Sequence, residues 1–167
     1  MRLFGHLFCE YLTYNRKNRS LEEIEDNLKR LGYDVGTRMW ELFLLRERAQ
    51  QNERTATTKN ELTTAKQVLE KIKNSFWKFA FGQPASSLER IRATDLQFYL
   101  IDRDPLTDFY ISYPRDYRGY VPSVFTGGMV QAALDACDID ATVQVHLISQ
   151  DGQLSTYYHI KCAEGQK

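Results

Sequence analysis

Large apolar side chains recur every three or four residues through the first half of the chain, a spacing that predicts amphipathic helices. The first helix is expected over about residues 2–16, and its apolar face is wider than a surface helix needs. Two adjacent rows make this face: Leu3, Leu7, Tyr11 and Tyr14, and beside them Phe4, Phe8 and Leu12. Burial of these side chains would contribute on the order of ten kcal/mol. We expect another chain to cover part of this face, the alternative being an ordinary core helix.

Caps and spacing predict two further helices after this one. Ser20 and Glu23 match a capping box, which would start the second helix, and Gly32 is expected to end it in a left-handed cap. Asp34 is then expected to cap a third helix. Gly36 lies early in that helix and indicates a close approach by neighbouring backbone. The third helix has little polar face, so a central position is predicted for it.

A polar stretch at about residues 49–61 contains no large apolar side chain and is predicted to be a loop, an insertion or a solvated helix extension. From Leu62 to Phe79 the apolar spacing is again that of one long helix. Gly82 is expected to end this helix, and Pro84 prevents its return.

The spacing then changes to the alternation typical of strands. Two strands are expected over 96–101 and 109–113, and after them a helix that Ser123 can cap. A final hairpin is expected around Asp151-Gly152, a strong two-residue turn signal. The order of helices, two strands, a helix and two strands predicts an α+β fold, with the helices packed on one side of a twisted four-stranded antiparallel sheet.

All 167 residues are expected to form a single domain. Lys and Arg number 22, as do Asp and Glu, so the formal net charge is zero. This balance argues against nucleic acid as the main partner, because such proteins carry a basic surplus, although it leaves a local basic patch open. The cysteines Cys9, Cys137 and Cys162 share no metal-ligand spacing and indicate a reduced, intracellular protein. No stretch reaches the ~20 apolar residues of a membrane span, so a soluble chain is expected.

No residue pattern predicts a catalytic site, because the sequence has neither a serine in a glycine elbow nor a phosphate loop. His146 and His159 are expected as diagonal neighbours on the polar face of the final hairpin. Without a third ligand on that face they are interpreted as solvated side chains. Gly127-Gly128 precedes an apolar helical run, where tight packing explains the glycines better than an anion site. No catalytic residue, metal site or cofactor is therefore expected.

Several short blocks follow one another in fixed order along most of the chain. They are Leu31-Gly32-Tyr33-Asp34-Val35-Gly36-Thr37-Arg38, Phe76-Trp77-Lys78-Phe79-Ala80-Phe81-Gly82, Ala85-Ser86-Ser87-Leu88-Glu89, Tyr110-Ile111-Ser112-Tyr113-Pro114 and Phe125-Thr126-Gly127-Gly128-Met129-Val130. In this order they resemble the TRAPP subunits that are related to the lipid-pocket subunit, and the subunit 5 family best of all. The motif residues expected to be structural are Gly32, Gly36, Arg38, Trp77, Gly82, Gly127 and Gly128.

This resemblance implies a non-catalytic scaffold subunit of a complex that tethers vesicles and activates a Rab GTPase by nucleotide exchange. The complex acts in ER–Golgi and Golgi transport, which implies a cytoplasmic protein peripherally associated with those membranes. The implied partners are the lipid-pocket subunit, bound through the N-terminal helices, and a longin-type subunit; the GTPase is contacted only through the assembled complex. The expected partner-binding residues are Leu3, Leu7, Phe8, Tyr11, Leu12, Ile24 and Leu28.

The chain also departs from the family pattern. The lipid-pocket relative carries an acylated cysteine shortly after its third helix, whereas this chain has no cysteine between Cys9 and Cys137, so that acylation is not carried over. The alternative function is an apolar small-molecule or lipid-binding module of the same fold. Its candidate walls are Met39, Phe43, Leu69, Phe76 and Met129, which also suit an ordinary core.

Overall fold

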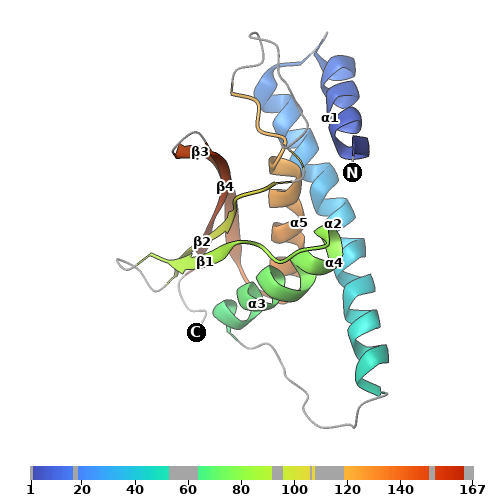
Figure 1. The fold of residues 1–167 in the computed structure, drawn as a ribbon, viewed down its shortest axis with the longest axis vertical. Helices are drawn as coiled ribbons and strands as arrows, with labels where there is room; N and C mark the ends of the chain where they lie inside the picture. The colour runs from blue at the N-terminus through green and yellow to red at the C-terminus, as the bar shows by residue number, and fades with distance from the viewer. Residues whose placement is uncertain are drawn as a thin grey trace.

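Helices cover one side of a four-stranded antiparallel sheet in the computed structural model, which describes residues 2–16, 19–52, 64–91, 96–105, 107, 119–150 and 153–163. The helices are α1 Arg2–Asn15, α2 Leu21–Asn52, α3 Ala65–Lys71, the π-helical turn η1 Ile72–Phe76, α4 Trp77–Phe81 and α5 Val124–Asp135. The strands are β1 Ser87–Arg90, β2 Gln97–Asp102, β3 Ala141–Gln150 and β4 Gln153–Cys162, in the spatial order β1-β2-β4-β3. Figure 1 shows α5 lying between the sheet and the long helix α2. The predicted α+β class is confirmed.

The second helix does not end at Gly32, so the prediction of two helices separated there is wrong. Helix α2 runs without a break from Leu21 to Asn52. Its predicted start is confirmed, because the backbone amide of Ser20 donates to the Glu23 carboxylate at 2.9 Å and the Glu23 amide donates to the Ser20 hydroxyl at 3.3 Å. The first residues of the predicted polar stretch continue this helix, and residues 53–61 lie outside the described part.

Gly32 serves the packing of α2 against α5, not a helix end. A Cβ atom at Gly32 would lie 1.9 Å from the carbonyl oxygen of Phe125, and one at Gly128 would lie 2.1 Å from the carbonyl oxygen of Lys29. The close approach predicted at Gly36 is also present, since a Cβ there would lie 2.5 Å from the Cα of Met129. The two backbones therefore meet at a distance that only glycine permits.

The long helix predicted up to Gly82 is present from Ala65 as α3, η1 and α4 in succession. One π-helical turn, Ile72–Phe76, interrupts its regular hydrogen bonding. Gly82 has a φ of 86° in the left-handed region, and its amide donates to the carbonyl of Lys78 at 2.9 Å. The predicted end of this helix at Gly82 is therefore confirmed, and the left-handed conformation there is one that glycine adopts readily.

Three of the four expected strands are present where the alternation placed them. The final hairpin pairs Val143 with Ile160 and Val145 with Tyr158, so its apolar side chains share the face that the helices cover. The strand expected at 109–113 and the turn at Asp151-Gly152 lie outside the described residues. The fourth described strand is β1, which the spacing did not predict, because its sequence Ser-Leu-Glu-Arg is short and carries one large apolar side chain.

Ser123 precedes α5 as expected but does not cap it with its side chain. Its hydroxyl instead lies 2.8 Å from the Thr107 hydroxyl and 3.2 Å from the Thr156 hydroxyl of β4. All three groups are buried. A buried hydroxyl needs a partner, and this network ties the start of α5 to the sheet.

The proposed walls of an apolar pocket are packed against one another. Phe43, Leu69, Phe76 and Met129 are buried, and Met39 packs against the same core. The Phe43 and Phe76 ring centroids are 5.7 Å apart, and Trp40 lies 5.3 Å from Phe43 and 5.1 Å from Phe76. These are the distances of a packed aromatic core.

Candidate partner-binding surface

Helix α1 lies along the first part of α2 (Figure 1), and four of the seven predicted partner-binding residues face inward there. Phe8, Leu12, Ile24 and Leu28 are at most 4% exposed. The Phe8 ring lies 5.4 Å from that of Phe125 in α5, so one row of α1 is part of the chain's own core. These four side chains stabilise the domain and are not available to a partner in this conformation, which corrects their assignment to a surface.

The other predicted row of α1 stays at the surface. Leu7 is 55% exposed and Tyr14 is 86% exposed, and each lies about one helical turn from Tyr11, Leu7 before it and Tyr14 after it. Tyr11 is half-buried, and burial raises the pKa of its phenol while the nearby Arg19 lowers it. Leu3 belongs to the same row by position, and its side chain lies outside the described part. Leu7 and Tyr11 therefore keep their place as candidate contacts.

A second exposed apolar row runs along α2 and continues the line of Ile24 and Leu28. The row consists of Leu31, Val35, Leu42 and Leu45, whose spacing of three, four or seven residues puts them on one face of the helix. Leu31 is 40%, Leu42 45% and Leu45 61% exposed, and Val35 is half-buried. In Figure 1, α1 lies beside only the upper part of α2, and most of α2 extends beyond it.

The exposed rows of α1 and α2 form what we call the α1/α2 face: Leu7, Tyr11 and Tyr14 with Leu31, Val35, Leu42 and Leu45. Sequence reasoning missed the α2 part because it placed this segment in a central helix. The signal was present in the spacing, since the row from Ile24 to Leu45 keeps a helical period without a break. Leucines of this size, half-exposed on one face, would each contribute about 1 kcal/mol on burial by a partner.

The family-motif residues are distributed between the core and this face. Trp77 is buried in α4, and its Nε1 donates to the Asp102 carboxylate at 3.3 Å. Arg38 is exposed on α2, within the same row as Leu31 and Leu42. A Cβ at Gly127 would lie 2.5 Å from a methyl group of Val145, so this glycine lets α5 pack on the sheet. Among these motif residues, the glycines and Trp77 therefore serve internal packing, whereas Arg38 is exposed.

The outer face of the sheet carries the two histidines that sequence reasoning paired. The His146 and His159 ring centroids are 6.3 Å apart, and the Nε2 atom of His159 lies 3.2 Å from the Gln97 side-chain oxygen. Burial lowers the pKa of His159, and the positive charges of Lys161 and His146 lower it further. Among the described residues, no group of three or more His, Cys, Asp and Glu side chains could hold a metal ion.

Within the described residues, no helix has an apolar stretch long enough to cross a lipid bilayer. Among the described residues, the α1/α2 face gathers exposed apolar side chains, which suit a contact with another protein.

Comparison with known proteins agrees with this arrangement. The family model described as "Transport protein particle (TRAPP) component" matches residues 4–163. "Trafficking protein particle complex subunit 5" of Gallus gallus is 34% identical over 144 residues, which cover 86% of this chain and 72% of that protein. The protein of the same name from Dictyostelium discoideum is 27% identical over 151 residues, which cover 90% of this chain and 76% of its relative. These relatives confirm the resemblance to subunit 5.

A solved structure has the same fold. The crystal structure of a trafficking protein particle complex subunit 3 from Naegleria fowleri, covalently bound to palmitic acid, matches this chain with a TM-score of 0.75. The match covers 99% of this chain and 96% of that one, at 14% sequence identity. At this identity the similarity concerns the fold alone.

Proposed function

Because the chain belongs to the family of transport protein particle (TRAPP) components, we propose that it is a scaffold subunit that holds sister subunits together in a TRAPP complex. Membership of this family implies a role in vesicle trafficking. The observation that carries the proposal is the α1/α2 face, on which Leu7, Leu31, Leu42 and Leu45 are each at least 40% exposed. Large apolar side chains exposed in rows on two helices are typical of a protein–protein contact.

The partner we assign to this face is the lipid-pocket subunit, with a longin-type subunit bound elsewhere on the chain. Within the assembled complex the chain takes part in activating a Rab GTPase by nucleotide exchange, in transport between the endoplasmic reticulum and the Golgi. Its place is then cytoplasmic and peripheral to Golgi and ER–Golgi membranes. The family match supports the coarser part of this proposal, membership of a complex with sister subunits, because relatives of this chain are named as subunits of a trafficking protein particle complex.

The pairing is tested with the two pure subunits. The full chain and the lipid-pocket subunit of the same cell are mixed at micromolar concentration and measured by sedimentation velocity. We expect one species with the mass of a one-to-one heterodimer. Separate monomers at every concentration tested would refute the pairing.

The absence of enzymatic activity in the isolated chain is tested separately. The Rab GTPase is loaded with a fluorescent GDP analogue, and its release is followed with and without the pure chain. We expect the same release rate in both samples and a faster one with the assembled complex, since exchange is proposed to belong to the assembly. Acceleration by the pure chain would contradict a non-catalytic role.

A further inference from the structure

An arginine lies in the middle of the apolar row that α2 exposes. Arg38 follows Leu31 and Val35 and precedes Leu42 and Leu45, at alternating separations of four and three residues. This is the heptad spacing by which one helix packs along another. Since the other positions of the exposed row are apolar, the row carries a single charge, at its centre.

The guanidinium of Arg38 is available to a partner. Arg38 is exposed, and the carboxylates of Asp34 and Glu41 lie four residues before it and three after it. Ion pairs form at these separations on many helices. In the part of the chain that the structure describes, however, Arg38 makes no ion pair with either carboxylate. The fold therefore leaves this positive charge unused.

Two copies of the chain could pair through this row only by bringing two arginines together. Arg38 has two apolar positions of the exposed row on each side of it. In a parallel pair each position meets its equal, and in an antiparallel pair with full overlap the middle positions meet. Both arrangements bring two guanidinium groups close together in a contact that excludes water, where like charges repel strongly.

A different partner avoids this repulsion if its helix presents a carboxylate opposite Arg38. A planar guanidinium binds a carboxylate through two parallel hydrogen bonds, which gives the pair both strength and a fixed geometry. Without such an acceptor, a covered arginine loses its hydration and gains no bond in return. One polar position within an apolar heptad row can in this way fix the partner and the register of two helices.

We propose that Arg38 is a specificity-determining residue within the α1/α2 face: it prevents the pairing of two identical chains and selects a sister-subunit helix that presents a carboxylate. The leucines of the row supply the affinity, and Arg38 supplies the choice of partner. This inference rests on the proposed function, because it takes the α1/α2 face to be the contact with the lipid-pocket subunit.

The first test needs only this chain. The wild type and Arg38→Glu are measured by sedimentation velocity, each alone and then in an equimolar mixture, after circular dichroism has shown that both are folded. We expect monomers in each separate sample and a dimer of one wild-type and one variant chain in the mixture, because Arg38 then faces a carboxylate. A wild-type homodimer, or a mixture that contains only monomers, would overturn the proposal.

The second test measures the dissociation constant of the heterodimer with the lipid-pocket subunit. We expect Arg38→Gln to weaken binding at least tenfold and Arg38→Glu at least a hundredfold, because the partner's carboxylate loses its cation or meets a like charge. Arg38→Lys keeps the charge and should bind more tightly than Arg38→Gln. The matched control is Arg30→Glu, an exposed arginine outside the row, which should change binding less than twofold.

The outcomes separate this inference from the proposed function. Wild-type affinity of both Arg38→Gln and Arg38→Glu would overturn the role of Arg38 and leave the heterodimer standing. An equal loss of affinity with Glu41→Gln would also overturn it, since Arg38 would then pair within its own chain. If the wild type forms no heterodimer, the proposed function fails, and the mixture of wild type and Arg38→Glu still decides whether Arg38 controls pairing.

Discussion

Asp102 is a carboxylate held inside the domain at the end of β2. It is 8% exposed and accepts hydrogen bonds from Trp77 Nε1 at 3.3 Å and from the Asp104 amide at 3.2 Å. Burial raises the pKa of Asp102, and the two hydrogen bonds only partly oppose this effect. The charged form is therefore less favourable in the folded protein than in the unfolded chain.

The change Asp102→Asn should remove a pH dependence of stability. Because the folded pKa is raised, the folded state binds this proton more tightly, so the stabilisation is full below the ordinary pKa of 3.8 and is lost as the pH rises through the folded value. We expect the free energy of unfolding of the variant, relative to wild type, to increase from pH 3.5 toward pH ~7. Urea unfolding at several pH values measures this difference. The control Asp140→Asn removes an exposed carboxylate by the same chemical change.

The crossing of α2 and α5 is the element-level feature on which the fold depends. Gly32 and Gly36 of α2 face Phe125 and Met129, and Gly128 of α5 faces Lys29. On its other side α5 packs on the sheet, where Gly127 faces Val145. Because the Phe8 ring of α1 packs 5.4 Å from that of Phe125 in α5, a separation of α2 from α5 would also part α2 from α1. The α1/α2 face thus depends on glycines that it does not contain.

The change Gly32→Ala should destabilise the domain although alanine favours helix by up to about 1 kcal/mol. The added methyl group would meet the Phe125 carbonyl oxygen, a backbone atom that cannot turn away. We expect a loss of about 2 kcal/mol or more in the free energy of unfolding, measured by urea denaturation. The matched control is Arg30→Ala on the exposed side of the same helix, expected within about 0.5 kcal/mol of wild type. Equal stability of Gly32→Ala and wild type would contradict the close crossing.

Local signals predicted the elements better than the contacts between them. The capping box at Ser20 and the helix end at Gly82 depend on neighbouring residues, and the sequence predicts both. Gly32 looks locally like a helix end. A glycine is needed there because the backbone of Phe125, far along the chain, packs against it. Ser123 likewise looks like a helix cap in the sequence, but in the fold its hydroxyl lies within hydrogen-bonding distance of the Thr156 hydroxyl of β4.

The same limit applies to the candidate surface. The apolar width of α1 indicates that it must contact something on both rows, but it does not say which row faces the chain's own core. That choice follows from the position of Phe125 beside Phe8, which leaves Leu7 outside. The spacing from Ile24 to Leu45 could have revealed the exposed row on α2 if Gly32 had not been interpreted as a break.

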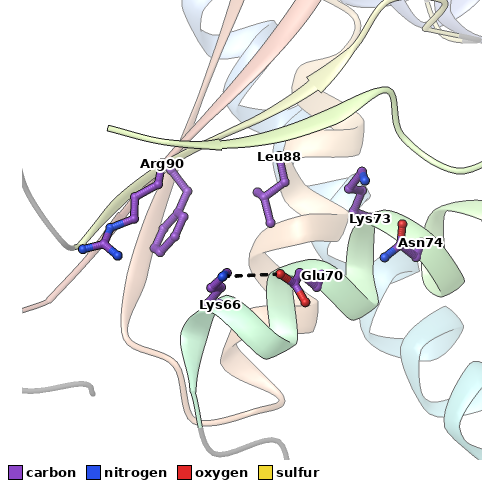
Figure 2. A pocket seen from close by; sticks show the side chains of 7 residues that line it. Lys66, Glu70, Lys73, Asn74, Leu88 and Arg90 are labelled. Atoms are coloured by element: carbon purple, nitrogen blue, oxygen red, sulfur yellow. Dashed lines mark ion pairs between the residues drawn. The ribbon is translucent and has the colours of Figure 1, made fainter. Parts of the chain in front are cut away.

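At the scale of the whole molecule, the domain presents two separate surfaces around one core. The α1/α2 face lies on the helical side of the molecule (Figure 1). A pocket between β1 and the helix of α3 and η1 is lined by Lys66, Glu70, Lys73, Asn74, Leu88, Arg90 and Phe98 (Figure 2). With zero formal net charge, no overall field opposes association.

The most direct test of the central claim is the dissociation constant of the heterodimer with the lipid-pocket subunit, for wild type, Leu42→Glu and Leu7→Glu. A charge placed in an apolar contact would be buried without a partner, so we predict at least a hundredfold weaker binding for each variant, while circular dichroism shows an unchanged fold. The control Lys78→Glu should bind as wild type does. Wild-type affinity for both leucine variants, or unfolding of the isolated chain by either, would contradict the assignment of the α1/α2 face as the partner-binding surface.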